Sequence, residues 1–173
     1  MDRKIFFILV TVCVITHIVR LIYEILKHKK LIVPGKLSFI IIFTDMMLLW
    51  ISWCFLCSFD PYKMNLYGVF RYSGALLACA GLILFISGFF TIKTLESYEG
   101  NLITTGIYSI IRHPMYLGFI LWLIGFPLYF DSLFSLMLSF VFIVNVISWR
   151  YFEERELEKR FSSYFEYRKT TLF

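Results

Sequence analysis

The polar residues best suited to chemistry lie in two short segments of an otherwise apolar chain. The first segment runs from Leu102 to Gly118 and contains a turn at Gly106 and the pair His113-Pro114. Proline suits the first turn of a helix, because its missing N–H would have no helical partner there. A helix that begins at Pro114 therefore offers free backbone N–H groups and the positive end of its dipole to an anion such as a carboxylate or a phosphate.

The second polar segment runs from Trp149 to Glu158 and follows a long apolar run. Arg150 and Glu154 lie four residues apart within it, so they share one face of a helix. The Glu154 carboxylate can bind an ammonium group or a ribose hydroxyl. If the two segments meet in space, they form a site for a zwitterionic ligand that resembles an amino acid.

Each of these polar residues also has a simpler interpretation. Arg, His and Tyr side chains are common at the membrane–water interface, where they anchor helices. His113 taken alone is more often a structural residue that holds a turn than a catalytic one. The combination is what favours a site: a Gly-Ile-Tyr turn, a His-Pro step at the start of a helix, and an Arg-Glu pair on one helical face.

The composition of the chain is typical of an integral membrane protein. Of its 173 residues, 60% are hydrophobic and 20% are aromatic, and the mean hydropathy is +0.77. A soluble fold could not bury so much apolar surface. The net charge of +5 comes mostly from Lys and Arg between apolar runs, which argues against a nucleic-acid partner. The four cysteines lie inside apolar runs and predict neither a disulfide nor a metal site.

The apolar runs predict an all-α, multi-pass transmembrane helix bundle with five spans. The runs are Ile5–Leu26, Leu37–Phe59, Tyr72–Ile92, Pro114–Phe130 and Ser132–Trp149. Residues 1–92 would hold the first three helices, and residues 93–173 the motif region with its cofactor loop, helical hairpin and C-terminal helix. We expect that C-terminal helix, Arg150–Tyr167, to be amphipathic and to lie at the cytoplasmic membrane surface or over the site, with Tyr164 and Tyr167 packing the tail.

Two features predict how the membrane helices pack. Arg20 and Asp45 lie at similar depth on either side of a basic loop, which favours an ion pair between them; the alternative is that Asp45 lines a substrate path. Gly74, Gly81 and Gly88 recur every seven residues, and such a row of small residues lets another helix approach closely. That second helix can belong to the same chain or to another copy.

The distribution of basic residues predicts the orientation in the membrane. Lys and Arg residues outside the apolar runs gather on the side that holds the loop Lys27–Lys36, the segment around His113, and the C-terminus. Basic loops face the cytoplasm in multi-pass proteins. Both polar segments are therefore expected on the cytoplasmic face of a bacterial or archaeal plasma membrane or of the endoplasmic reticulum.

The two polar segments resemble the motifs of the isoprenylcysteine carboxyl methyltransferase family, whose members are multi-pass membrane enzymes that use S-adenosylmethionine. The resemblance rests on Leu-Ile-Thr-Thr-Gly-Ile-Tyr at residues 102–108, Arg-His-Pro-Met-Tyr-x-Gly at residues 112–118, and Arg-x-x-Glu-Glu-x-x-Leu at residues 150–157. It extends from Lys93 to Lys169, whereas the N-terminal helices match only in being hydrophobic.

The resemblance implies a role for each motif residue. Contacts with S-adenosylmethionine are implied for Lys93, Leu102, Ile103, Tyr108, His113, Pro114, Met115, Tyr116 and Glu154. Arg150 is implied to bind the lipid substrate, and Arg150 and Glu154 form the implied catalytic pair. Where some relatives carry a His or Thr, this chain has Gly100-Asn101, so a contact there can come only from the backbone or from a different side chain.

The implied reaction transfers a methyl group to the carboxylate of a lipophilic acceptor, with a C-terminal prenylcysteine or an analogue as the expected substrate. A carboxylate is already ionised at neutral pH and needs no general base. A water-poor pocket favours the cancellation of opposite charges. Related families with an Arg-His-Pro motif methylate phospholipid amines or reduce lipids, and an amine acceptor would require a base such as His113. A non-catalytic membrane adaptor is a further alternative.

Overall fold

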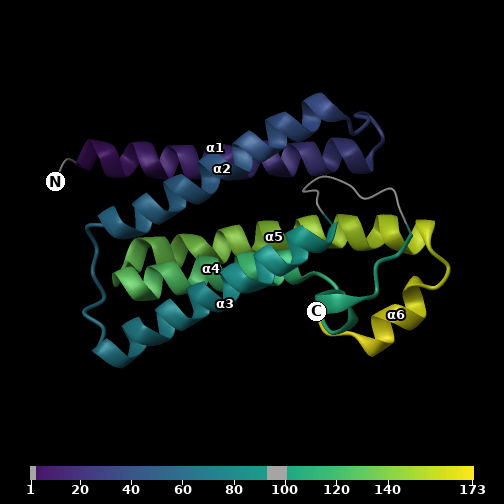
Figure 1. Ribbon diagram of the computed structural model, residues 1–173. Helices are drawn as coiled ribbons and strands as arrows, with labels where there is room; N and C mark the ends of the chain where they lie inside the picture. Colours follow the sequence, from purple (N-terminus) through teal and green to yellow (C-terminus); the bar gives the residue numbers. More distant parts are fainter. Residues whose placement is uncertain (1–2, 93–100) are drawn as a thin grey trace.

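The computed structural model describes residues 3–92 and 101–173, and the regular structure within these ranges is helical, as predicted. Figure 1 shows the order of the elements along the chain. They are α1 (Arg3–His28), α2 (Lys36–Phe59), α3 (Gly68–Ile92), the 3₁₀ turn η1 (Gly106–Ser109), α4 (Pro114–Phe130), α5 (Leu133–Arg160) and α6 (Tyr164–Thr170). Lys93, one of the expected cofactor contacts, lies outside the described residues.

Within the part of the chain that the structure describes, four helices are long and apolar enough to cross a bilayer: α1, α2, α3 and α5. The helix α4 is apolar but has only 17 residues, which is short for a membrane span. Of the five predicted spans, four therefore have the length needed to cross a bilayer. The short helix begins at Pro114, as expected, and ends at Phe130; the next residue, Asp131, caps it with a left-handed backbone of φ 61°. The number and apolar character of these helices make the chain an integral membrane protein.

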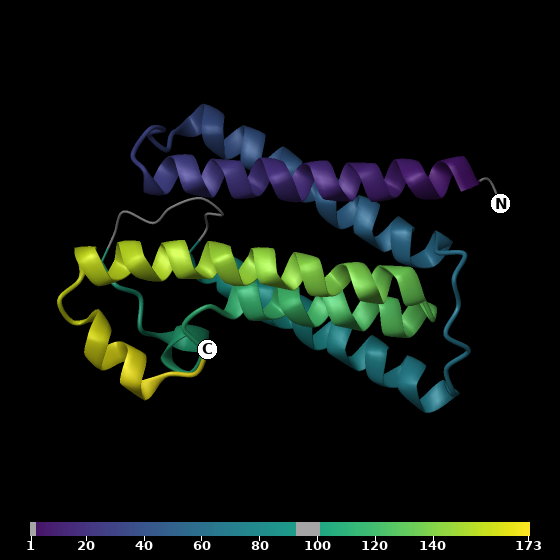
Figure 2. The same ribbon diagram turned by 180° about the vertical axis from the view of Figure 1, so that it is seen from behind.

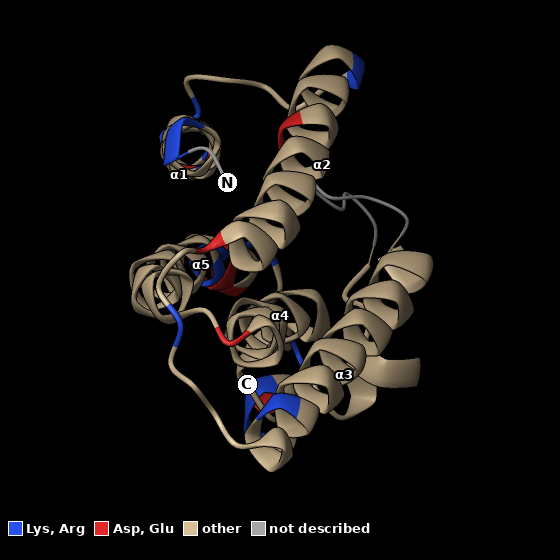
Figure 3. Cartoon of the chain, turned by 90° about the vertical axis from the view of Figure 1, so that its left-hand side faces the viewer, with Lys and Arg blue, Asp and Glu red and all other residues tan. Residues whose placement is uncertain are grey.

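The helix α4 lies at the centre of the bundle. It packs against α2, α3 and α5, while α1 packs against α2 and α5. Viewed from one end in Figure 3, α4 and α5 lie between α3 on one side and α1 and α2 on the other, and most of the helical surface carries no charge. The end of α5 and the start of α4 therefore reach the same end of the molecule, where α6 also lies (Figures 1 and 2).

The predicted row of glycines on α3 is the surface that receives α4. A Cβ atom added to Gly81 would lie 2.5 Å from the carbonyl oxygen of Gly118, which is too close for any side chain. Gly74 meets Gly125 in the same way, and Gly88 faces the start of α4 at Met115. The close approach was predicted correctly, and the partner is a helix of the same chain.

The predicted ion pair between Arg20 and Asp45 is wrong. The Arg20 guanidinium pairs instead with Glu24 on its own helix, at 2.6 Å, and Lys27 lies 2.9 Å from the other oxygen of the same carboxylate. Residues four apart on a helix always share a face, whereas equal depth on two helices does not make two side chains point towards each other. The Arg20 guanidinium also lies 5.5 Å from the ring centre of Trp149, which links α1 to α5.

Two aspartates fix the loops at the far end of the bundle from the polar segments. The buried Asp60 carboxylate accepts hydrogen bonds from the backbone N–H and the hydroxyl of Ser135, in the first turn of α5. The Asp131 carboxylate accepts hydrogen bonds from the backbone N–H groups of Asn65 and Leu66. These bonds hold the helical hairpin of α4 and α5 in register with the α2–α3 connection.

The C-terminal region differs from the single amphipathic helix predicted for Arg150–Tyr167. The helix α5 continues without a break through Arg160, and the chain then turns at Phe161, whose backbone is extended, before α6 begins at Tyr164. Two serines follow Phe161, and serine competes with helical hydrogen bonding through its own hydroxyl. The turn lets α6 fold back beside η1, which matches the expectation that the tail lies over the site (Figure 2).

The glycine contact predicts a stability test. Replacing Gly118 with Ala places a methyl group against the backbone of Gly81, so we expect a loss of about 1–3 kcal/mol in the free energy of unfolding and a lower yield of folded protein. Thermal unfolding of the purified protein in detergent measures this loss. The matched control is Gly68→Ala, because a Cβ there lies at an ordinary 3.7 Å from its nearest neighbour. Equal stability of the two variants would refute the packing role of Gly118.

Candidate functional site

The first polar segment folds into a short turn that aims its basic side chains at α5. Gly106 adopts φ 62°, a left-handed conformation that glycine accepts without strain, and η1 follows directly. The 3₁₀ turn buries Tyr108 and ends before Ile110. His113 then occupies the N-cap position of α4, ahead of Pro114 at the first helical position.

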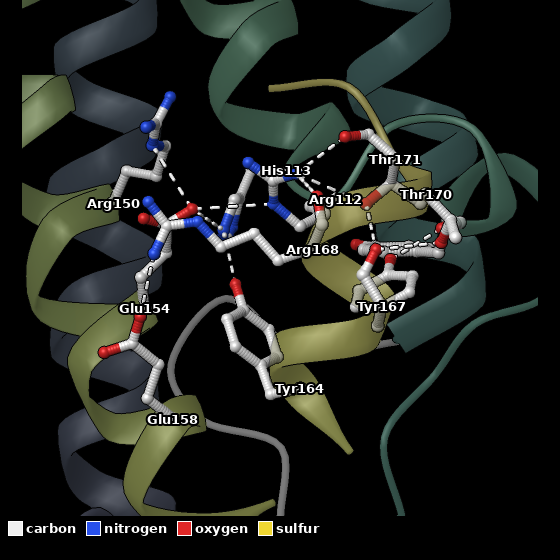
Figure 4. A network of polar contacts seen from close by, with 11 residues as sticks. Arg112, His113, Arg150, Glu154, Glu158, Tyr164, Tyr167, Arg168, Thr170 and Thr171 are labelled. Carbon is white, nitrogen blue, oxygen red and sulfur yellow. Dashed lines mark hydrogen bonds and ion pairs between the residues drawn. The ribbon is translucent and has the colours of Figure 1, made fainter. Parts of the chain in front are cut away.

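The two polar segments meet at the Glu154 carboxylate (Figure 4). Its Oε1 atom lies 3.4 Å from Nε2 of His113, 3.6 Å from Nε of Arg112 and 3.8 Å from Nε of Arg150. Arg150 comes from the preceding turn of α5, whereas Arg112 and His113 come from the segment before α4. The spacing of Arg150 and Glu154 on one helical face therefore places both beside the His-Pro step.

The members of this cluster differ in their access to solvent. The side chain of His113 is 4% exposed and those of Arg112 and Glu154 are 9% exposed, whereas that of Arg150 is 24% exposed. A buried carboxylate is costly unless basic groups and hydrogen bonds compensate its charge. Arg112 and His113 provide that compensation from the buried side, and Arg150 is the most exposed cation of the cluster.

Two tyrosines of the C-terminal helix extend the cluster. The Tyr164 hydroxyl lies 3.4 Å from Nε2 of His113. Burial, and then the negative charge of Glu154, raise the pKa of the Tyr164 phenol, so this hydroxyl stays protonated at neutral pH. The Tyr167 hydroxyl donates a 2.6 Å hydrogen bond to the carbonyl of Tyr108, and burial raises its pKa as well. The helix α6 is thereby tied to η1.

The residues after α6 are also held against the site. A guanidinium nitrogen of Arg112, Nη1, donates to the carbonyls of Arg168, at 2.9 Å, and Thr171, at 2.7 Å. The backbone N–H of Arg112 donates to the carbonyl of Leu172 at 3.0 Å, and the N–H of Leu172 donates to the carbonyl of Ile110 at 2.8 Å. Arg112 thus joins the Glu154 carboxylate to the end of the chain.

The last described residue lies against the most exposed cation of the cluster. The Phe173 ring centre is 4.4 Å from the Arg150 guanidinium carbon, a distance at which a cation and a ring face attract each other. This contact and the tail contacts of Arg112 were not predicted from the sequence. Backbone bonds between distant segments leave no pattern in a single sequence.

A cavity of about 430 Å³, measured out to its open mouth, lies beside this cluster. Its walls include the predicted residues Leu102, Ile103 and Tyr108, together with Arg112. The remaining wall residues were not predicted as site residues: Ile92, Glu153, Leu157, Phe161, Tyr164 and Tyr167. The spacing of Leu157, Phe161 and Tyr164 is typical of the apolar face of a helix, and this spacing was the available signal for that wall.

The other predicted residues lie elsewhere. His113, Arg150 and Glu154 line neither this cavity nor the second one, and Glu154 lines a separate hollow on the α5 side. Met115 and Tyr116 line a second, more apolar cavity of about 400 Å³, whose walls also include Arg20, Met46, Phe85, Phe119 and Trp149. Pro114 is fully buried at the contact with Gly88 and lines neither cavity. Tyr116 interacts with Glu153, which lines the first cavity, so the two cavities approach each other at this pair.

The chemistry of the first cavity suits a ligand with a flat ring, a positive charge and an amino-acid group. The rings of Tyr108, Phe161 and Tyr164 offer surfaces for a heterocycle and for a cation. Glu153 on the wall and Glu154 beside it supply acceptors for ammonium or hydroxyl donors. S-adenosylmethionine has each of these features, and the residues present therefore fit it.

Comparison with known proteins gives consistent matches over this region. Residues 69–164 match the family model described as phospholipid methyltransferase. Protein-S-isoprenylcysteine O-methyltransferase of Saccharomyces cerevisiae is 34% identical, over 50% of this chain and 41% of that protein. The protein of the same name from Xenopus laevis is 35% identical over 43% of this chain and 26% of its own length. Protein-S-isoprenylcysteine O-methyltransferase B of Arabidopsis thaliana is 36% identical over 37% and 30%.

These matches confirm the resemblance predicted from the two motifs. The region that matches the family model begins in α3, ends at the start of α6, and contains both polar segments. The chain spans less than half the length of the relatives just described. No solved structure matches the chain significantly.

The contacts of Arg112 predict how the tail responds to its loss. In an Arg112→Gln variant the bonds of Nη1 to Arg168 and Thr171 disappear, so we expect faster amide hydrogen exchange at Leu172 and in α6. Hydrogen exchange followed by mass spectrometry measures the effect, which should be at least about tenfold because bonds to a charged group contribute about 1.5–3 kcal/mol each. Lys169→Gln serves as the control, since its partner Glu166 is an exposed neighbour. Unchanged exchange in the Arg112 variant would contradict the tail contact.

Proposed function

The chain belongs to the phospholipid methyltransferase family, and we propose that it transfers a methyl group from S-adenosylmethionine to the carboxylate of a lipophilic acceptor. The observation that carries the proposal is the convergence of Arg112, His113 and Arg150 on Glu154, at the edge of an aromatic cavity. The relatives that are named protein-S-isoprenylcysteine O-methyltransferases support a C-terminal prenylcysteine, or an analogue, as the acceptor.

The first cavity is the proposed binding site for the cofactor, which supplies a methyl group on a positively charged sulfur. Leu102, Ile103 and Tyr108 form one wall, and Tyr164 closes the side next to His113. We assign Glu154 to the amino group of the ligand, because its carboxylate is oriented by three basic neighbours and lies in partly buried surroundings. The assignment makes Glu154 a binding group that does not accept a proton.

Arg150 is the proposed contact for the acceptor carboxylate. Its greater exposure and its position on the same helical face as Glu154 let it orient an incoming anion beside the cofactor cavity. With the cofactor bound, an oxygen of the acceptor carboxylate would donate the electron pair of the new C–O bond while the methyl–sulfur bond breaks and its electron pair stays on the departing thioether, so no proton has to be removed. The transfer would cancel both charges, and a site with little water would lower the barrier to it.

The second cavity is the proposed site for the apolar part of the acceptor. Met115, Phe119 and Trp149 give it an apolar lining, and Tyr116 places it next to Glu153 on the wall of the first cavity. A lipid chain in the second cavity and a carboxylate near Arg150 would approach the first cavity from the bundle interior. This arrangement makes Met115 and Tyr116 acceptor-side residues in place of the cofactor contacts implied by the motif.

The same site supports proposals on orientation and on the division of the chain. The basic residues near the site favour a cytoplasmic active site and C-terminus. Residues 93–173 supply both polar segments, and residues 1–92 supply scaffold helices, of which α1, α2 and α3 each contribute one side chain to the second cavity. Lys93 stays a proposed cofactor contact on the basis of the motif alone.

A second candidate is methylation of a phospholipid amine, which the description of the matching family favours. A protonated amine must lose a proton before it can attack a methyl group. His113 is the imidazole available for that purpose, and its Nε2 atom lies between the Tyr164 hydroxyl and the Glu154 carboxylate. Both reactions use the same cofactor cavity and differ only in the acceptor.

The reaction product distinguishes the two acceptors. Membranes that contain the full chain are incubated with S-adenosylmethionine labelled in its methyl group and with a farnesylated cysteine analogue. We expect label in the lipid fraction that base releases as methanol, because esters hydrolyse and methylamines do not. Label that survives base treatment would support the amine acceptor, and the absence of transferred label with either class of acceptor would refute the proposed activity.

Variants of the cluster test the separate roles of its residues. Glu154→Gln should weaken binding of S-adenosylhomocysteine at least about tenfold, since a charge-assisted bond of about 1.5–3 kcal/mol is lost. Arg150→Gln should lower turnover more than cofactor affinity. Isothermal calorimetry and initial rates give the two quantities. Glu158→Gln is the control, because Glu158 lies one turn further along α5 and pairs with the exposed Arg168. Unaltered binding in the Glu154 variant would refute its role.

A further inference from the structure

A separate pocket of about 760 Å³, measured out to its open mouth like the two cavities above, lies between the end of α1, the α1–α2 turn and the last turns of α5. None of the residues that line it lines either cavity of the proposed active site. Among the described residues, its polar lining consists of Lys27, His28, Lys30 and Lys159 with a single acid, Glu156. Two distant parts of the chain therefore bring basic side chains to one hollow surface.

The charge of the described lining favours an anion. The ammonium of Lys27 lies 2.9 Å from the Glu24 carboxylate and is largely buried. Lys30 and Lys159 are exposed, and they come from opposite walls of the pocket. A concave surface that carries ammonium groups on both walls attracts a compact anion, and a phosphate has the charge and the oxygens to bind several lysines at once.

The backbone at Lys30 shows that this side chain occupies a conformationally unfavourable position. The N–H of Leu31 donates to the carbonyl of Leu26, and the N–H of Lys30 donates to the carbonyl of Lys27, both at 2.9 Å. This pair of bonds defines the usual helix ending in which a glycine takes the left-handed position. Lys30 occupies that position with φ 57°, a backbone conformation that residues other than glycine, asparagine or aspartate seldom adopt.

The same turn also carries exposed apolar side chains, one of which, Val33, lines the pocket. Leu31 is 70% exposed, Val33 is 85% exposed and Leu37, at the start of α2, is 72% exposed. In an integral membrane protein such side chains contact lipid chains, and the basic side chains beside them lie at the level of the head groups. The pocket therefore lies where a lipid phosphate can reach it.

We propose that the pocket between Lys30 and Lys159 binds a phosphate group, either as the head group of an anionic phospholipid or as a free phosphate compound. The inference does not depend on the proposed methyl transfer. It rests on the pocket, on lysines contributed by two separate segments, and on the left-handed Lys30.

The test uses the full chain purified in an uncharged detergent, with thermal unfolding as the readout. The probes are short-chain phosphatidylglycerol, short-chain phosphatidylcholine and glycerol 3-phosphate, each titrated over the same concentrations. We expect phosphatidylglycerol to raise the unfolding midpoint and phosphatidylcholine to have a smaller effect. Stabilisation by glycerol 3-phosphate at the same concentrations would identify a free phosphate as a ligand, and stabilisation by phosphatidylglycerol alone would identify a lipid.

The variants separate the pocket from general surface charge. Lys30→Gly removes one ammonium and gives the turn the residue that its backbone favours, so the protein without lipid should keep its unfolding midpoint or gain slightly. Its apparent affinity for phosphatidylglycerol should fall about fivefold, as expected for one basic residue at a membrane surface. Lys159→Gln, on the opposite wall, should show a similar loss.

The control is Lys29→Gln, which removes the same charge from the adjacent residue of the same turn but does not alter the pocket lining. This variant should bind phosphatidylglycerol as the unmodified protein does. An equal loss in the Lys29 and Lys30 variants would overturn the proposal in favour of non-specific surface attraction. Equal stabilisation by phosphatidylglycerol and phosphatidylcholine, or no stabilisation by any probe, would also overturn it.

Discussion

The arrangement of the site depends on one buried carboxylate. The Glu154 side chain is largely buried. An uncompensated charge in such surroundings destabilises the folded state by several kcal/mol, which is on the order of the whole free energy of unfolding of a domain. Its compensation comes from His113 and Arg112 at the start of α4 and from Arg150 on its own helix. Each partner is in turn held by something else: His113 adjoins Tyr164, and Arg112 is fixed by the end of the chain.

The membrane helices determine whether those partners can meet. Gly81 and Gly118 let the backbones of α3 and α4 approach to a distance that no side chain permits, and Gly88 receives Pro114 at the first turn of α4. The position of His113 is therefore set by packing inside the bundle. Arg20 of α1 contributes a charge to the second cavity, so the N-terminal helices are part of the proposed acceptor site as well as its scaffold.

The proposed reaction does not require the protein to accept or donate a proton. A carboxylate acceptor and a positive sulfur neutralise each other, and the contribution of the protein is to bring them together and to exclude water. The family model described as phospholipid methyltransferase spans both polar segments of this chain, and the chain is also similar to relatives that are named for isoprenylcysteine. In the proposed function, both acceptors would use the same cofactor cavity, and the lining around Met115 and Tyr116 would distinguish between them.

The sequence by itself determined the helices, the start of α4 at Pro114, the turn at Gly106 and the glycine contact surface of α3, because periodicity, proline and glycine act locally or along one helix. The tertiary structure decided the partner of Arg20, which is Glu24 and not Asp45, since depth in a membrane does not specify the direction of a side chain. It also decided the break at Phe161 and the backbone bonds between Arg112 and Leu172. Those features arise when distant segments pack together, and a hydrogen bond between two backbones requires no particular residue at either end.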